Sequence, residues 1–206
     1  MVCGLKKSGT WRFPRRGVCR AGCLIAFLLV FPAVAQRYDE VVITAADYKN
    51  LDTFETAALA KADKVFAAKD YRAATAEYDL FLVENGRSSA SAYALLRKGR
   101  SQMLDNKRYE AVRTFKEVID YFPDSVLYAA AALYYQGQCH FENGERANAV
   151  KVWQKMVADD EYARHTLAAP ALLALADELA RQQKTAEAAS YYEQAAFEFR
   201  NKNPDV

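Results

Sequence analysis

A small residue followed by an aromatic residue recurs four times in this chain of 206 residues, and no other feature constrains the fold as strongly. In each copy an alanine precedes an aromatic residue by four positions: Ala74 and Tyr78, Ala111 and Phe115, Ala149 and Trp153, Ala188 and Tyr192. Twelve positions before these alanines lie four more small residues: Ala62, Gly99, Gly137 and Ala176. Successive copies are separated by 37, 38 and 39 residues. Such a period predicts stacked helical hairpins, because one hairpin alone cannot bury its apolar face.

The spacing within each copy places its two small residues on consecutive helices, where we expect close packing. The aromatic residue lies one turn further along the second helix, on the same face. Turn-forming pairs separate the two helices of each hairpin: Lys69-Asp70, Asp105-Asn106, Asn143-Gly144 and Gln183-Lys184. Stronger breaks, such as Pro123 followed by Asp124 and Ser125, separate successive hairpins. The predicted hairpins cover residues 55–86, 90–123, 126–160 and 168–203.

These residues resemble the tetratricopeptide repeat (TPR) family, most clearly in Gly137 to Gly144 with Ala149 and Trp153 behind them. The resemblance extends over about residues 55–200. It implies an all-α fold, a right-handed α-solenoid of about four TPR-like helical hairpins. The segment from Tyr121 to Ser125 is also similar to the slightly long repeats of bacterial envelope proteins. Examples are the Tol–Pal-associated periplasmic coordinator and the TPR lipoprotein of outer-membrane β-barrel assembly. An ordinary helical bundle is the alternative.

The N-terminus is typical of a secretory signal peptide over residues 1–35. Residues 1–22 contain six basic residues and no acid, and an apolar run of 13 residues follows, from Cys23 to Ala35. The run ends in Ala33-Val34-Ala35, and small residues of this kind precede a cleavage site. Thirteen apolar residues are too few to span a bilayer comfortably, so we expect cleavage before Gln36 and no membrane span afterwards. An uncleaved anchor is the alternative.

Removal of this segment changes the charge of the chain. It takes six of the 28 basic residues and none of the 26 acids, which leaves a net charge of −4. A mildly acidic chain without a basic face argues against nucleic acid as a partner. Cys139 becomes the one remaining cysteine, so an intrachain disulfide is excluded and a buried structural role is favoured.

Residues 36–54 form a short lead before the solenoid. Its apolar patch, Val41-Val42-Ile43, is either disordered or lies against the first hairpin. Asp52 and Glu55 have the spacing of a capping box at the start of the first long helix. At the other end no polar helix follows the last hairpin. We therefore expect that hairpin to cover its own end, or a partner or a second copy of the chain to cover it.

The sequence offers no catalytic or cofactor-binding motif. His140 and His165 are the two histidines, and neither has a partner at metal-binding spacing. A nucleophile motif and a glycine-rich phosphate loop are both missing. We therefore predict a non-enzymatic protein without metal or cofactor.

Protein binding is the remaining function. In the family that the chain resembles, the first helix of each hairpin lines a concave wall that receives an extended peptide or a partner helix. Candidate inward-facing residues in the first and fourth hairpins are Thr56, Leu59, Asp63, Leu173, Ala174 and Asp177. In the second and third hairpins the candidate inward-facing residues are Tyr93, Leu96, Arg97, Arg100, Ala131, Tyr134, Tyr135 and Gln138. Tyrosine and arginine are enriched at interface hot spots, so we predict the partner site at Tyr93, Arg97, Arg100, Tyr134, Tyr135 and Gln138. One of Tyr134 and Tyr135 is expected to pack in the core instead.

Two classes of function follow. The first is an exported scaffold, periplasmic or secreted, which binds an envelope protein or peptide in its concave groove. The second is a structural subunit of an envelope assembly, self-associating or docking through its terminal repeat. A third and weaker reading is a sugar-facing module that uses exposed tyrosines. The family's carboxylate clamp is not expected, because Leu59, Asp63, Arg97, Ala131 and Tyr135 supply one basic residue at its positions.

Overall fold

The computed structural model describes residues 41–202, with side chains to residue 200, and this part of the chain is helical. The signal peptide, residues 1–35, and the start of the lead lie outside the described residues. The elements of the described residues are α2 (Ala45–Lys49), α3 (Thr53–Ala67), α4 (Tyr71–Glu84), α5 (Ser91–Leu104), α6 (Arg108–Tyr121), α7 (Val126–Glu142), α8 (Arg146–Ala158), η1 (Tyr162–Arg164), α9 (Ala168–Arg181) and α10 (Thr185–Lys202).

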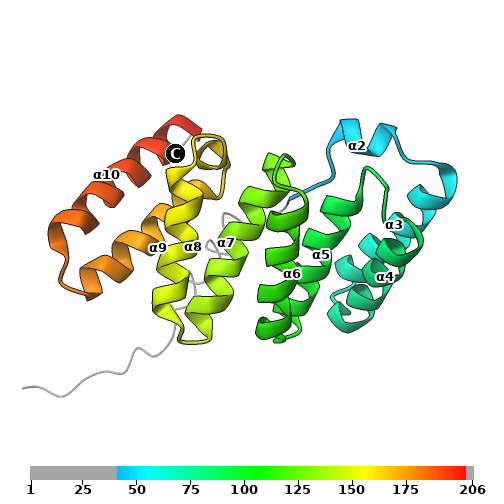
Figure 1. The fold of residues 1–206 in the computed structure, drawn as a ribbon, viewed down its shortest axis with the longest axis horizontal. Coiled ribbons are helices and arrows are strands. Elements are labelled where there is room, and N and C mark those ends of the chain that lie inside the picture. The colour runs from blue at the N-terminus through cyan, green and yellow to red at the C-terminus, as the bar shows by residue number, and fades with distance from the viewer. Residues whose placement is uncertain (1–40, 203–206) are drawn as a thin grey trace, which may run out of the picture.

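The long helices pair in chain order into hairpins α3–α4, α5–α6, α7–α8 and α9–α10, and each hairpin packs on the next. Figure 1 shows them following one another along the long axis, with α10 at the end opposite α3. The predicted all-α solenoid of four helical hairpins is therefore confirmed for residues 41–202. None of the helices in this range is both long and apolar enough to cross a membrane.

The turn inside each hairpin has one residue in the left-handed region. These residues are Lys69 (φ 64°), Asn106 (φ 64°), Gly144 (φ 80°) and Gln183 (φ 63°), each seven positions after the small residue of its first helix. A left-handed residue ends a helix and reverses the chain. The predicted capping box is also present, since Asp52 and Glu55 each bond the other's backbone N–H at the start of α3.

Aromatic residues of the repeat pattern pack directly over the small residues of their own hairpins. A Cβ atom added to Gly99 would lie 2.6 Å from Cε1 of Phe115. One added to Gly137 would lie 2.2 Å from Nε1 of Trp153. The close contact is thus between a ring and a backbone rather than between two backbones. The buried members of the pattern are Ala62, Ala74, Tyr78, Gly99, Ala111, Phe115, Gly137, Ala149, Trp153, Ala176 and Ala188, whereas Tyr192 is 38% exposed.

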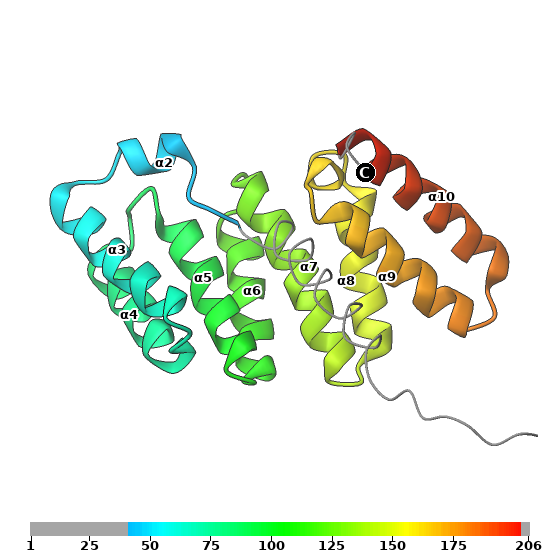
Figure 2. The ribbon, with the colours of Figure 1, turned by 180° about the vertical axis from the view of Figure 1, so that it is seen from behind.

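The described part of the lead is neither disordered nor confined to the first hairpin, which corrects both expectations for it. The Tyr128 hydroxyl at the start of α7 accepts from the backbone N–H of Thr44 (2.9 Å) and donates to Asp47 (2.7 Å). Ser89, just before α5, donates to the Asp47 carbonyl (2.7 Å). Figures 1 and 2 show α2 near one end of the first helix of each of the first hairpins, between α3 and the start of α7. The lead therefore ties the second and third hairpins together.

The junction between the third and fourth hairpins differs from the others. A loop with η1 separates α8 from α9, and the Tyr162 hydroxyl reaches back to the Pro123 carbonyl (3.1 Å). Helix α8 packs less extensively on α9 than α4 does on α5 or α6 does on α7. An ion-pair network compensates in part, because the buried Glu178 of α9 binds Arg146 of α8 (2.8 Å) and Arg181 (2.6 Å).

Candidate functional site

A cavity of about 350 Å³ lies where the third and fourth hairpins meet, and we call it the groove cavity. Its lining residues are Tyr134, Gln138, Phe141, Glu142, Trp153, Ala174 and Asp177. Four of them, Tyr134, Gln138, Ala174 and Asp177, belong to the inward-facing set predicted from the sequence. The structure therefore brings predicted groove residues of α7 and α9 together around one cavity.

The helical period of α7 explains the arrangement of its lining residues. Tyr134, Gln138 and Phe141 are separated by four and three positions, so they lie on one face of the helix. The Gln138 amide donates to the Tyr134 hydroxyl (2.7 Å), and Trp153 Nε1 donates to the Tyr134 carbonyl (3.2 Å). The Phe141 and Trp153 ring centroids are 6.0 Å apart. These contacts hold three aromatic rings and one amide in a fixed arrangement.

The two carboxylates of the groove cavity have different environments. Glu142 pairs with Arg108 of the second hairpin (2.5 Å). Asp177 is exposed and accepts a hydrogen bond from the Tyr192 hydroxyl (2.6 Å). This bond raises the pKa of Tyr192, because it stabilises the protonated hydroxyl. The cavity thus offers aromatic faces, an amide and the carboxylate of Asp177, which suits a side chain of a bound polypeptide.

Tyr93 and Tyr135 do not face a groove, which corrects their predicted role as partner-binding residues. Tyr93 is 4% exposed and Tyr135 is 1% exposed. The Tyr93 ring packs edge-on against Tyr128, the residue that holds the lead, with centroids 6.0 Å apart. Tyr135 packs against Phe115 (5.7 Å) and Tyr134 (5.4 Å). Of Tyr134 and Tyr135, one was expected in the core, and it is Tyr135.

Arg97 belongs to a cluster of side chains that joins the first and second hairpins. Asp63 of α3 accepts hydrogen bonds from the hydroxyls of Tyr78 (2.5 Å) and Tyr93 (3.0 Å). The Arg97 Nε atom lies 3.2 Å from the Tyr78 hydroxyl and 3.7 Å from Asp63, and its guanidinium lies 3.7 Å from the centre of the Phe66 ring. We call these five residues the junction cluster. Arg97 therefore stabilises the contact between hairpins.

Burial sets the protonation of the tyrosines in the junction cluster. It raises the pKa of Tyr78 and Tyr93 far above the ordinary value, and the positive charge of Arg97 opposes this rise only in part. Both hydroxyls therefore stay protonated and donate to Asp63. Arg100, the next arginine along α5, is partly exposed and stacks over the Tyr135 ring (4.1 Å).

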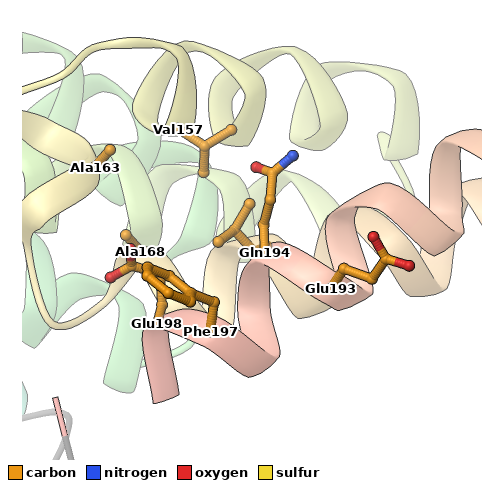
Figure 3. A pocket seen from close by; sticks show the side chains of 8 residues that line it. Val157, Ala163, Ala168, Glu193, Gln194, Phe197 and Glu198 are labelled. Atoms are coloured by element: carbon orange, nitrogen blue, oxygen red, sulfur yellow. The ribbon is translucent and has the colours of Figure 1, made fainter. Parts of the chain in front are cut away.

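A second cavity, of about 330 Å³, lies under the last helix. It is lined by Val157, Ala163, Ala168, Leu172, Glu193, Gln194, Phe197 and Glu198. In Figure 3, Gln194 and Phe197 project from α10 toward this space, opposite Val157 and Ala168. Phe197 is 61% exposed, so the cavity opens to the surface beside an uncovered aromatic ring.

The sequence interpretation missed Phe141, Glu142 and Trp153 as lining residues. Phe141 could have been found, because it continues the face of Tyr134 and Gln138 by one turn. Trp153 was predicted only as a marker of the repeat, and it has two roles: its ring covers Gly137, and it also lines the cavity. Glu142 carried no signal of its own, since a charge at the end of a helix is usually solvated.

Other reactive side chains are held in packing or surface contacts. Cys139 is buried, and burial raises the pKa of its thiol to about 12. His140 lies 2.6 Å from Glu145 through Nδ1, and the buried His165 accepts from the Leu167 N–H (3.0 Å). Within residues 41–202 no group of three or more histidine, cysteine, aspartate or glutamate residues could hold a metal ion.

The chain is a stack of helical hairpins, and a cavity lies between the third and fourth of them. This architecture is that of a repeat scaffold. Residues 93–125 and 131–160, which cover most of the second and third hairpins, match the model of the tetratricopeptide repeat family and support the resemblance. A search of curated proteins gave no match. TPR proteins are typically scaffolds for protein–protein interaction, and the chain has that fold and two matched repeats.

Proposed function

We propose that the chain is a non-catalytic adaptor of the bacterial cell envelope, exported to the periplasm or secreted, which holds a segment of a partner protein. The groove cavity carries this proposal. It combines three aromatic rings, an amide and the exposed carboxylate of Asp177 on helices of two successive hairpins. A cavity of this kind can receive a side chain of a polypeptide lying across the first helices.

The test compares partner recovery by two variants of the full chain. Gln138→Ala with Phe141→Ala removes the amide and the more exposed ring of the cavity. Arg113→Ala with Glu117→Ala changes two exposed residues of α6 and is the matched control. We expect crosslinked pull-down from envelopes to lose the partner with the first variant only, while circular dichroism shows folded protein for both. Equal recovery by the two variants would reject the cavity as the binding site.

The envelope location rests on the signal-peptide pattern of residues 1–35. N-terminal sequencing of the exported protein should start at Gln36, and bulky residues in place of Ala33 and Ala35 should leave the precursor in the inner membrane. A mature protein that retains residues 23–35 would support the anchor instead.

Docking through the terminal repeat is the second candidate function. It is favoured by the exposed Phe197 ring beside the open cavity and by the exposed Tyr192 on the last helix. In this case the chain is a structural subunit of an envelope assembly, bound to another protein or to a second copy of itself. Light scattering on the mature chain separates the two: self-association predicts a dimer or larger species, and the adaptor predicts a monomer.

A further inference from the structure

The outer face of the fourth hairpin repeats the acidic face with which the first hairpin holds its neighbour. Asp177 and Tyr192 occupy the register of Asp63 and Tyr78, counted from the small residues of each hairpin. The geometry repeats as well: Tyr78 donates to Asp63 Oδ1 at 2.5 Å, and Tyr192 donates to Asp177 Oδ1 at 2.6 Å. Each pair lies fifteen positions apart in the sequence.

In the first hairpin this face binds two consecutive basic residues of the following helix. Arg97 of α5 bonds the Tyr78 hydroxyl and lies 3.7 Å from Asp63. Lys98, the next residue, pairs with Asp79 of α4 at 2.5 Å. The residue of the fourth hairpin in the register of Asp79 is Glu193. Both acidic positions of the first hairpin therefore recur in the fourth.

The same face of the fourth hairpin has no cation on it among the described residues. Asp177 accepts the Tyr192 hydroxyl and has no ion pair there, and Glu193 is exposed. Glu193 stands at the edge of the cavity beneath α10, which it helps to line, and its side chain is exposed there (Figure 3). Coverage differs accordingly: Tyr78 is 0% exposed beneath α5, and Tyr192 is 38% exposed.

The middle hairpins do not have this acidic pair. At the register of Asp63 they carry Arg100 and Gln138, and at the register of Asp79 they carry Lys116 and Gln154. The helices that follow the middle hairpins are α7 and α9. At the register of Arg97 they carry Tyr135 and Ala174, neither of which is basic. The acidic pair is therefore present at the one junction that receives Arg97 and Lys98 and missing from the two junctions without an arginine at that register.

We infer that the outer face of α9–α10 docks an α-helix of a partner protein that carries an arginine followed directly by a lysine. The arginine donates to the Tyr192 hydroxyl and forms an ion pair with Asp177, as Arg97 does with Tyr78 and Asp63, and the lysine pairs with Glu193. Ala189 and Ala196 flank Tyr192 on the exposed side of α10 and are small enough to let a helix approach. Stacking on an aromatic ring is missing here, because Ala180 stands at the register of Phe66.

A second copy of this chain fits the face less well than another protein does. If a copy continued the solenoid, its α3 would take the place of α5. Ala60 and Lys61 stand in α3 at the register of Arg97 and Lys98, so the arginine would be missing. Lys61 is also already paired with Glu77 (2.8 Å). The inference rests on the second candidate function, and it shares only Asp177 with the groove cavity.

The test uses a stapled helical peptide with the sequence of Ser91–Leu104, which carries Arg97 and Lys98 in their native helix. Its binding to the full mature chain is measured by fluorescence anisotropy at low and high salt. The control peptide has glutamine at both basic positions. We expect the basic peptide to bind about tenfold more tightly than the control, with an advantage that shrinks in high salt.

Protein variants locate the binding face. Asp177→Asn with Glu193→Gln should reduce affinity for the basic peptide to that of the control peptide. Glu110→Gln with Glu117→Gln removes equal charge from exposed positions of α6 and should change nothing. The groove variant Gln138→Ala with Phe141→Ala should also bind the peptide normally, which separates this face from the groove cavity.

Several results would overturn the inference. These are equal binding of the two peptides, no binding of either, or unchanged affinity in the Asp177→Asn, Glu193→Gln variant. A dimer of the parent chain that this variant abolishes would identify a second copy as the occupant and overturn it too. Loss of an envelope partner on Ala189→Trp, but not on the acidic double change, would keep docking at this end and overturn the basic-helix chemistry.

Discussion

At the scale of single residues, the type of aromatic residue in each hairpin goes with the small residue opposite it, which is either glycine or alanine. Phe115 and Trp153 lie over Gly99 and Gly137, at distances that leave no room for a Cβ atom. In the outer hairpins the ring is a tyrosine and the small residue is an alanine. There the hydroxyl reaches an aspartate on the first helix, Asp63 or Asp177. One repeat position therefore has two solutions, one apolar and one with a hydrogen bond.

Gly137→Leu tests the apolar solution. The added side chain would displace the Trp153 ring, whose Nε1 atom lies 2.2 Å from the new Cβ position. We expect a loss of stability of about 1–3 kcal/mol, and hence a melting temperature lower by several degrees. Lys151→Leu, at an exposed position of α8, is the control and should melt like the parent. Equal melting of all three proteins would show that the ring can move aside at no cost.

At the scale of elements, α2 is held by its contacts rather than by its own helical stability. It has five residues, and an isolated helix of that length is unstable in water. The Tyr128 hydroxyl joins Thr44 to Asp47 and so closes the lead onto α7. Because the Tyr128 ring also packs on Tyr93, the lead helps to bury a residue of α5.

Tyr128→Phe should release the lead while keeping the ring in place. Loss of two hydrogen bonds of about 1 kcal/mol each should raise amide exchange in residues 41–50 by tenfold or more. Exchange in α5 and α7 should change much less, because the aromatic packing remains. Tyr121→Phe removes a hydroxyl from an exposed tyrosine and serves as the control. Slow exchange of the lead in the Tyr128 variant would mean that apolar contacts of Val41 suffice.

The ion-pair network of Glu178 predicts how the α8–α9 junction responds to acid. Hydrogen bonds from Arg181, with others from Gln182 and Arg146, lower the pKa of Glu178 from 4.5 to about 2. A lowered folded-state pKa gives stability that is present above pH 4.5 and is lost as the pH falls toward 2. Since both arginines are largely solvated, we expect on the order of 1 kcal/mol.

Glu178→Gln should remove this pH dependence. Urea unfolding at pH 7 and at pH 3 should show a smaller loss of stability on acidification for the variant than for the parent. Glu187→Gln, at an exposed position of α10, should follow the parent. A variant that loses as much stability as the parent would place the acid-sensitive groups elsewhere.

Much of the element order could be predicted, because small residues, turn pairs and aromatic residues recur at one period. The depth of a residue within its face could not. Helical phase places Tyr93 and Tyr135 on the inward side, but their burial depends on Tyr128 and Phe115, which other helices supply. The contact between Tyr128 and Asp47 joins residues 81 positions apart, and no local pattern encodes it. The groove cavity was predictable through Tyr134, Gln138, Ala174 and Asp177, and its Trp153 wall was not.

At the scale of the whole molecule, the two ends of the solenoid are secured differently. The first hairpin is bound to the second through the junction cluster and the Lys98–Asp79 pair, and Ser89, in the loop between them, donates to Asp47 of α2. The fourth hairpin meets the third through a looser junction, with an open cavity beneath α10. Stability in a solenoid is a sum of hairpin and interface terms, so unequal interfaces give unequal local stability.

Native-state amide exchange should therefore show that the fourth hairpin opens first. We expect the smallest opening free energies in α9 and α10, intermediate values in α3 and α4, and the largest in α5 to α7, which have neighbours on both sides. Binding of the basic stapled helix should raise protection in α9 and α10 before it affects α5, because it adds contacts to the outer face of α9–α10. The control peptide with two glutamines should leave the order unchanged. Equal protection across all eight long helices would mean that the described hairpins unfold as one unit and that α9 and α10 have no local weakness.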